Sequence, residues 1–167
     1  MGRPKAFLTY RGETFLDRWI RLFRVYCEDV IVVANAPLEA GGARTVVNPE
    51  PARGMLSSLQ CGIASLAPET RGAAFTPVDL PAVGDATIAR LIGGWSGERL
   101  RIPRYGDRRG HPVVVARDLF PEFLELPATG EAREVVRRHE SEIAYVDVDD
   151  PGILADVDTP ADYERLR

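Results

Sequence analysis

Residues 73–81 read AAFTPVDLP, a short apolar run that leads directly into an aspartate held between two prolines. Small and aromatic apolar residues that end at such a boundary are typical of a buried strand in an α/β sheet. Pro77 and Pro81 fix φ and lack an N–H group, so the chain leaves the sheet in a stiff, defined direction. We therefore expect Asp79 just beyond the carboxyl end of a strand, where open α/β sheets bind their ligands.

Asp79 has two interpretations that the neighbouring residues leave open. A rigid carboxylate in a crevice suits a hard cation such as Mg2+, and the cation in turn neutralises phosphate. The same aspartate could instead form an Asx turn that joins the strand to the next helix.

Length and composition narrow the class of protein. A chain of 167 residues predicts a single domain, 1–167, with a sizeable core. A formal net charge of −4 argues against a nucleic-acid partner, because binding a phosphate backbone requires positive surface. The sequence shows neither a bilayer-spanning apolar run nor a signal-peptide pattern, so we expect a cytoplasmic protein without a membrane partner. Cys27 and Cys61 lack metal-ligand spacing and are expected to be reduced core residues.

Helical and strand patterns alternate along the whole chain. Helices are expected at 14–26, 57–66, 85–95, 119–126, 131–139 and 160–166, and strands at 30–34, 45–47, 73–76, 101–103, 112–115 and 143–148. Asp85 is the expected N-cap of its helix. This alternation predicts a three-layer α/β fold with a mainly parallel sheet.

Two segments could contact phosphate groups. Lys5 follows a Gly-Arg-Pro turn, and a lysine beside a tight turn is a common phosphate partner, although most lysines are simply exposed. Gly54 permits close backbone approach, and Ser57 and Ser58 bring hydroxyls and free amides to a helix N-terminus. That arrangement favours an anionic or polar ligand, and the alternative is an ordinary capped helix.

Two further segments carry charge. Residues 105–112 contain Arg108, Arg109, Gly110 and His111, and Arg99, Arg101 and Arg104 lie just upstream. In an acidic chain this basic cluster predicts an anionic small-molecule ligand; the alternative is a solvated edge. Residues 156–160, DVDTP, place two acids at alternate positions ahead of a helix that starts with proline. Either Asp158 or Thr159 caps that helix, or one of the acids is a second metal ligand.

Taken in chain order, these motifs closely resemble those of the molybdenum-cofactor nucleotidyltransferases. The matching segments are MGRPK at 1–5, NP-x4-GMLSSL at 48–59, PVDLP at 77–81, RGHPV at 109–113 and DVDTPAD at 156–162. RGHPV and the acidic DVDTP are closer to the cytidylyltransferase branch than to the guanylyltransferases. The resemblance covers essentially the whole chain.

The resemblance implies a Rossmann-like nucleotidyltransferase domain that requires Mg2+. Its reaction would transfer CMP from CTP to the terminal phosphate of a molybdopterin-type cofactor and release pyrophosphate, with a molybdoenzyme as a possible recipient of the product. The attacking phosphate is already ionised at neutral pH, so no strong general base is needed, and His111 is expected to be a binding or structural residue rather than a base.

Site residues follow from the same resemblance, motif by motif. Lys5 and Asp79 would be catalytic, with Lys5 on the nucleotide phosphates. Gly54, Ser57 and Ser58 would line the nucleotide pocket together with Lys5 and Asp79, while Asp79 and Asp158 would hold Mg2+, and Tyr105, Arg109, Gly110 and His111 would face the pterin.

The chain departs from the family pattern in two places. The family opens with a strand and a glycine-rich L-A-A-G-x-S-x-R loop ahead of M-G-x-P-K, and this sequence begins at that Met. We therefore expect a longer natural protein in which a further strand and the phosphate loop precede Met1. Residues 129–133, TGEAR, also lack an acid of the family's G-D-x-G-A-R element.

Two other functions stay open. One keeps the chemistry but changes the acceptor to a sugar phosphate or another phosphate compound. The other is a non-catalytic cofactor-binding protein, which loss of the phosphate loop would produce.

Overall fold

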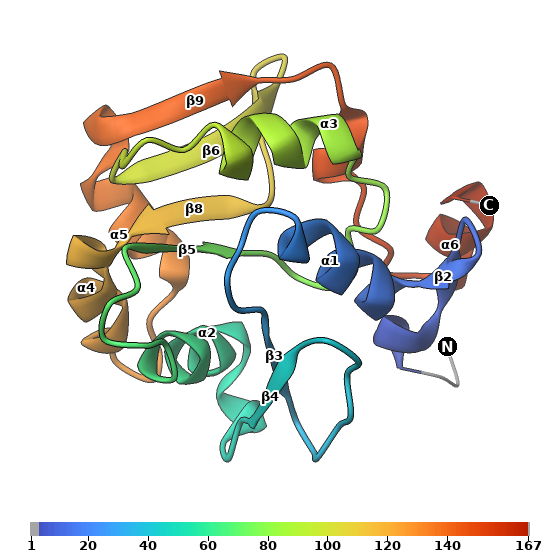
Figure 1. The fold of residues 1–167 in the computed structure, drawn as a ribbon, viewed down its shortest axis with the longest axis horizontal. Coiled ribbons are helices and arrows are strands. Elements are labelled where there is room, and N and C mark those ends of the chain that lie inside the picture. The colour runs from blue at the N-terminus through green and yellow to red at the C-terminus, as the bar shows by residue number, and fades with distance from the viewer. Residues whose placement is uncertain (1–3, 167) are drawn as a thin grey trace.

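Strands rich in β-branched and small apolar residues form the centre of the molecule, described here for residues 4–166 of a computed structural model. β5 (Gly72–Phe75), β8 (Val113–Ala116), β6 (Leu100–Tyr105) and β9 (Ile143–Asp147) lie side by side in that order (Figure 1). β8, with the sequence VVVA, is buried along its whole length, as a central strand should be. The expected α/β class is confirmed.

The other elements surround these strands. The remaining strands are β1 (Thr9–Tyr10), β2 (Glu13–Thr14), β3 (Ile31–Ala34), β4 (Arg44–Val47) and β7 (Arg108–Arg109). The α-helices are α1 (Phe15–Arg24), α2 (Met55–Ala64), α3 (Asp85–Ile88), α4 (Phe120–Leu124), α5 (Ala132–Arg138) and α6 (Pro160–Leu166). The 3-10 helices are η1 (Lys5–Phe7), η2 (Pro51–Arg53), η4 (Arg117–Leu119), η5 (Glu140–Glu142) and η6 (Pro151–Leu154), and η3 (Ala89–Gly93) is a π-helix.

The sheet is mixed, which corrects one part of the expected architecture. β8 runs antiparallel to both β5 and β6, while β9 runs parallel to β6, so β5, β6 and β9 share one direction. The link from β6 to β8 is too short for the crossover of a dozen or more residues that a parallel neighbour needs. The chain therefore turns back through β7 and returns as an antiparallel strand.

Helices cover both faces of this sheet (Figure 1). On one face, Trp19 and Leu22 of α1 and the buried side chains of α3 and η3 pack on Val114 and Val146. On the other face, residues of α2, α4 and α5 pack on Val113 and Val115. The period-2 alternation along β8 thus divides the core into two layers, and the three-layer arrangement is confirmed.

Asp85 does not cap its helix as expected. Gly84 precedes the first turn of α3, and Asp85 is the first helical residue. Its carboxylate oxygens lie 3.5 Å from Arg18 Nη2 and 3.2 Å from Arg21 Nη1 on α1. Because these arginines offer a charged partner to Asp85, the side chain joins α3 to α1 instead of closing its own first turn.

β3 and β4 form a separate, parallel two-stranded sheet. Between residues 4 and 166 no hydrogen bond joins β3 to β5, so each of these strands keeps a free edge. β3 and β5 are both half-buried, in contrast to the fully buried β8. The further strand expected upstream of Met1 stays a prediction.

Two other sequence expectations can be compared with the fold. Cys27 and Cys61 are free and half-buried, and burial raises the pKa of the Cys27 thiol. Within residues 4–166, none of the helices combines the length and the apolar character needed to cross a membrane.

His139 connects α4 to η5. Its Nδ1 lies 2.7 Å from Glu142 Oε1, and its Nε2 lies 2.7 Å from Glu122 Oε1. The hydrogen bond to Glu142, helped by the one to Glu122, outweighs burial and the charge of Arg99, and it raises the pKa of His139.

We predict that this connection makes stability depend on pH. Because the pKa of His139 is higher in the folded chain than the ordinary 6.5, its contribution is complete below pH 6.5 and is lost as pH rises through the folded value. Urea unfolding of the wild type and of His139→Gln from pH 5 to 9 should give a stability difference that shrinks with rising pH. A difference that is constant over this range would contradict the prediction.

Candidate active site

The segment after β5 is held from two sides. Arg18, which is buried on α1, donates from Nε to the carbonyl oxygen of Pro81 at 2.7 Å and from Nη2 to that of Val83 at 2.8 Å. On the other side, Val157 N donates to the carbonyl oxygen of Asp79 at 2.9 Å. Asp79 is therefore fixed just beyond the carboxyl end of β5, where the sequence predicted it.

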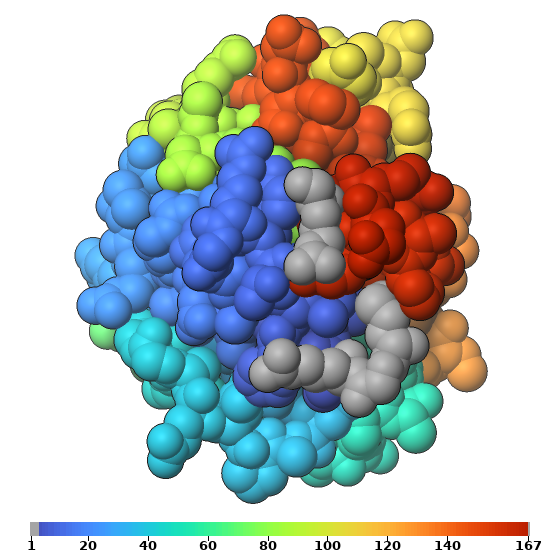
Figure 2. Space-filling view, turned by 90° about the vertical axis from the view of Figure 1, so that its right-hand side faces the viewer, coloured from blue at the N-terminus to red at the C-terminus, as the bar shows by residue number. Residues whose placement is uncertain are grey.

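Lys5 brings together two carboxylates from distant parts of the chain. Its Nζ lies 2.9 Å from Asp79 Oδ2 and 2.5 Å from Asp158 Oδ1. Figure 2 shows the N-terminal and C-terminal segments, blue and red, gathered on one face of the molecule. Burial opposes the charge of Lys5, but its hydrogen bonds to Asp158 and Asp79 prevail and raise the pKa of Lys5. The hydrogen bond from Lys5 is also the main reason that the pKa of Asp158 is lowered.

A cavity of about 360 Å³ joins this cluster to the basic loop. Arg109, Gly110 and His111 line it from one segment, and Asp79, Asp156 and Asp158 line it from two others. The rest of the lining is Met55, Pro77, Leu80, Ile153 and Leu154. Carboxylates and a guanidinium in one hollow suit a ligand that carries both phosphate groups and a bound cation.

Gly110 lets the basic loop approach η6 closely. Its N–H donates to the carbonyl oxygen of Pro103 at 3.0 Å, and a Cβ at this position would overlap the carbonyl oxygen of Ile153. The next residue, His111, donates its own N–H to Ile153 O at 3.3 Å. The loop and η6 therefore form one continuous wall of the cavity.

The environment of the His111 imidazole favours its neutral form, because burial lowers the pKa of the ring. The effect of burial exceeds the opposite effects of a hydrogen bond with the Phe75 backbone and of the Asp79 charge, which both raise the pKa of His111. The ring packs edge-to-face on Phe75, and among the described residues its buried Nδ1 has no hydrogen-bond partner. Because the lowered pKa favours the neutral ring, a polar contact from His111 to a ligand in the cavity adds little positive charge.

The serine segment lies beside the cavity and outside its lining. Ser57 is buried, and its Oγ lies 2.8 Å from the carbonyl oxygen of Gly54 and 2.8 Å from Asn48 Nδ2. Ser58 Oγ accepts a second hydrogen bond from Asn48 Nδ2 at 3.0 Å. Of this segment, Met55 is the residue that reaches the cavity.

The helix that follows Gly54 begins without a side-chain cap. Gly54 has φ of +83°, in the region that favours glycine, and in the described part of the chain no side chain caps α2. The first amides of α2 are thus open to a ligand. Tyr105, by contrast, is exposed and does not belong to the cavity lining.

The sequence does not predict the roles of three residues at the site. Arg18 carried a usable signal, because it interrupts the apolar face of helix 14–26 and so had to find buried partners. Asn48 belongs to the motif at 48–59, but the motif does not reveal that this residue donates hydrogen bonds to both Ser57 and Ser58. Met55 carried no signal beyond its place after Gly54.

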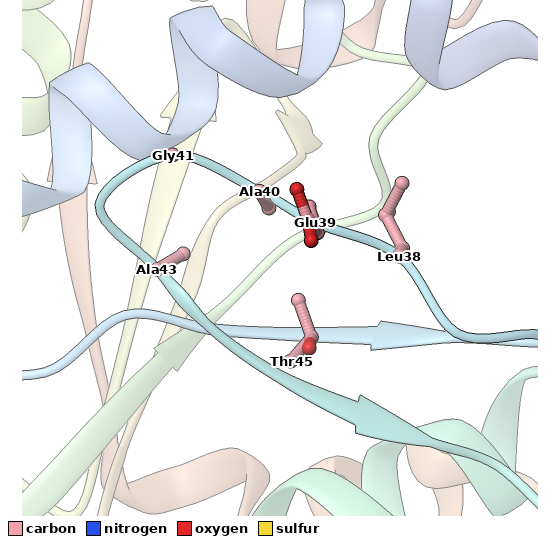
Figure 3. Close-up of a pocket in the computed structure, with 6 residues that line it drawn as sticks. All are labelled: Leu38, Glu39, Ala40, Gly41, Ala43 and Thr45. Carbon is pink, nitrogen blue, oxygen red and sulfur yellow. The ribbon is translucent and has the colours of Figure 1, made fainter.

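A second hollow carries little chemistry. It has a volume of about 500 Å³ and lies along the loop from 38 to 45, which connects β3 to β4 (Figure 3). Glu39 is the one charged residue among its six lining residues, and the others are small or apolar apart from Thr45. The cavity around Asp79 is therefore the better candidate for an active site.

Comparison with known proteins shows the family of the chain. The family model of the MobA-like NTP transferase domain matches residues 1–143. The chain belongs to this family. Molybdenum cofactor cytidylyltransferase of Escherichia coli (strain K12) is 22% identical over 171 residues, covering 98% of this chain and 86% of that protein.

Solved structures of similar proteins share the fold. Rv0371c from Mycobacterium tuberculosis, in complex with manganese, is 29% identical with a TM-score of 0.75, over 99% of this chain and 92% of that one. The 2-C-methyl-D-erythritol 4-phosphate cytidylyltransferase of Thermus thermophilus is 16% identical with a TM-score of 0.74, over 98% of this chain and 91% of that one. This family member is thus an enzyme of the nucleotidyltransferase class.

Proposed function

We propose that the protein transfers CMP from CTP to the terminal phosphate of a molybdopterin-type cofactor and releases pyrophosphate. The observation that carries this proposal is the single cavity in which Asp79 and Asp158, bridged by Lys5, meet Arg109 and His111. A nucleotide and a second phosphorylated substrate need such neighbouring sites. The 22% identical cytidylyltransferase supports this choice of substrates.

The carboxylates fit a divalent cation such as Mg2+. Asp79 Oδ2 and Asp158 Oδ1 already converge on one positive centre, the Lys5 ammonium, which stands in for a metal ion. Residues 4–166 contain no group of three His, Cys, Asp or Glu side chains that could hold a metal. Substrate phosphate oxygens would complete the coordination, as is usual for Mg2+. The manganese complex of Rv0371c supports a divalent metal here.

When bound, Mg2+ neutralises phosphate charge, and the chain's own residues position the substrates. Lys5 contacts the nucleotide phosphates as a mobile point charge. The open amides of α2 receive nucleotide oxygens, while Gly54 permits their close approach. Ser57 and Ser58, held by Asn48, keep this helix start in place, so their contribution is to the shape of the nucleotide pocket.

The group transfer needs positioning more than proton removal. An oxygen of the acceptor phosphate attacks the α-phosphorus of CTP, the new P–O bond forms, and the bond to the β-phosphate oxygen breaks with that electron pair leaving on pyrophosphate. Arg109 and His111 orient the acceptor from the other wall of the cavity. Tyr105, being exposed near this loop, contacts only a part of the pterin that extends beyond the cavity.

A second candidate keeps the reaction and changes the acceptor. The fold likeness to 2-C-methyl-D-erythritol 4-phosphate cytidylyltransferase favours a small phosphorylated alcohol or sugar. Pyrophosphate release should be measured with CTP, GTP and ATP, each alone, with molybdopterin, and with that sugar-alcohol phosphate. We expect release only with CTP and molybdopterin together; release with the small acceptor would select the second candidate, and release with no combination would reject both.

Asp79→Ala should abolish turnover and leave the fold intact. Loss of a metal ligand removes charge neutralisation in the transition state, so we expect kcat to fall by about 100-fold or more. Thermal unfolding and circular dichroism check the fold. Asp158→Asn should show a similar loss and Asp156→Asn a much smaller one, because Asp158 is the acid of this pair that contacts Lys5. A near-normal rate with unchanged Mg2+ dependence in Asp79→Ala would contradict the metal assignment.

The wall formed by Arg109 and His111 should act on the acceptor. Replacing both residues by Ala should raise KM for the pterin substrate much more than KM for CTP, because ground-state binding of one substrate is lost. Steady-state kinetics with each substrate varied in turn provides the measurement. Equal effects on both KM values, or no effect on either, would indicate that this loop is a solvated edge and does not bind the acceptor.

A further inference from the structure

Lys5 is the sole lysine of the chain; all other members of its 21 Lys and Arg residues are arginines. Its ammonium contacts the two carboxylates that the proposed function assigns to a divalent cation. An arginine would offer a planar fork with fixed geometry, whereas a lysine is a compact charge on a flexible stem. A lysine can therefore leave a pair of carboxylates by rotation of its stem alone.

We propose that Lys5 is an exchangeable internal cation, which neutralises Asp79 and Asp158 until a divalent metal displaces it toward the nucleotide phosphates. This inference rests on the proposed function and adds a regulation of the same site. The exchange implies that the protein binds a divalent metal only weakly when no nucleotide is present, because the metal must first displace the Lys5 ammonium from the carboxylates.

The contacts of Lys5 are suited to exchange. The Lys5 side chain is 31% exposed and that of Asp158 is 61% exposed, so water can replace each contact as it breaks. Partly exposed ion pairs of this kind are weak and are easily given up. Asp79, at 22% exposure, is the better shielded acid and keeps its place through the backbone hydrogen bond to Val157.

Charge balance explains why metal and nucleotide would bind together. The combined positive charge of a divalent cation and the Lys5 ammonium exceeds the negative charge of the two carboxylates. The two cations therefore repel each other at close range. The triphosphate of a nucleotide brings the negative charge that accommodates both cations. Metal and nucleotide should then each raise the affinity for the other.

The first test compares Mn2+ affinity among charge-matched variants, measured by electron paramagnetic resonance without nucleotide. Lys5→Met should bind Mn2+ about fivefold tighter or more than the wild type. Arg109→Met removes one positive charge from the same cavity, where Arg109 contacts Glu140 and Tyr145 instead of the two carboxylates that Lys5 contacts. This variant should change the Mn2+ affinity less than about twofold. Equal Mn2+ affinity in Lys5→Met and the wild type would overturn the proposal, as would an equal gain in both variants.

The second test observes Lys5 directly. Isotope labelling of lysine gives one side-chain signal in NMR, and titration with Mg2+ should move it toward the position of a free lysine. In Asp79→Ala the signal should start nearer that position and respond less. A signal that stays unchanged while Mg2+ saturates the wild type would also overturn the proposal.

Two controls keep the outcome clear. Lys5→Gln, together with thermal unfolding of both Lys5 variants, separates loss of the ammonium from loss of the fold. The pyrophosphate assay reports on the proposed function independently. Nucleotidyl transfer with an unmoved Lys5 signal rejects only the exchange, whereas metal-driven movement of Lys5 without transfer to any acceptor rejects only the proposed reaction.

Discussion

The candidate site depends on one backbone hydrogen bond, from Val157 N to the carbonyl oxygen of Asp79. It joins the segment after β5 to the extended segment before α6, so acids far apart in sequence meet. Val157 is buried, and in an extended chain its neighbours on both sides point the opposite way. Asp156 and Asp158 therefore both face the cavity. The buried guanidinium of Arg18 holds the same segment from α1, and these three hydrogen bonds to backbone carbonyl oxygens fix the position of Asp79.

Four of the arginines between residues 99 and 109 differ in how nearby acids hold them. Arg99, Arg101 and Arg104 are engaged by acids of their own surroundings: Asp118 and Glu142, Glu98, and Asp147 respectively. Arg109 alone among them lines the cavity, and its contact to Glu140 is a long one at 3.4 Å between exposed groups. Such a pair contributes little and is easily exchanged for a phosphate. Of these four arginines, Arg109 is thus the one placed to serve a ligand in the cavity.

Periodicity predicted the elements well because core packing enforces it. The expected helices and strands are present with ends within two residues of the observed ones, except that the helix expected at 85–95 is divided into α3 and the π-helix η3. The agreement arises because apolar spacing marks what faces the core. The hairpin of β1 and β2 was not predicted, because its strands are too short for a pattern; its turn, Arg11-Gly12, adopts positive φ at both residues. The reversed direction of β8 depends on the length of a link, which periodicity does not address.

For the site, spacing in the sequence identified single residues but not their partners. The convergence of Lys5, Asp79 and Asp158 depends on long-range contacts, and so does the internal hydrogen bonding of Ser57. In the same way the pKa of His111 follows from burial against Phe75, which the motif RGHPV does not reveal.

The nucleotide half and the metal half of the site follow strands of two different sheets. Residues 48–58 follow β4, and Asn48 N donates to the carbonyl oxygen of Ala34 at the end of β3. Asp79 instead follows β5, which the described chain does not join to β3 by hydrogen bonds. The distance between the nucleotide half and the metal half is therefore held by side-chain packing. Leu16 and Ile20 of α1 pack with Val32 of β3 and with Val78 beyond β5. α2 packs on β3 and shares a core cluster with residues of β5. Packing of this kind permits small relative shifts that a continuous ladder of backbone hydrogen bonds would prevent. The alignment of two substrates over a single bond therefore depends on how well the packing of α1 holds β3 and the segment after β5 together.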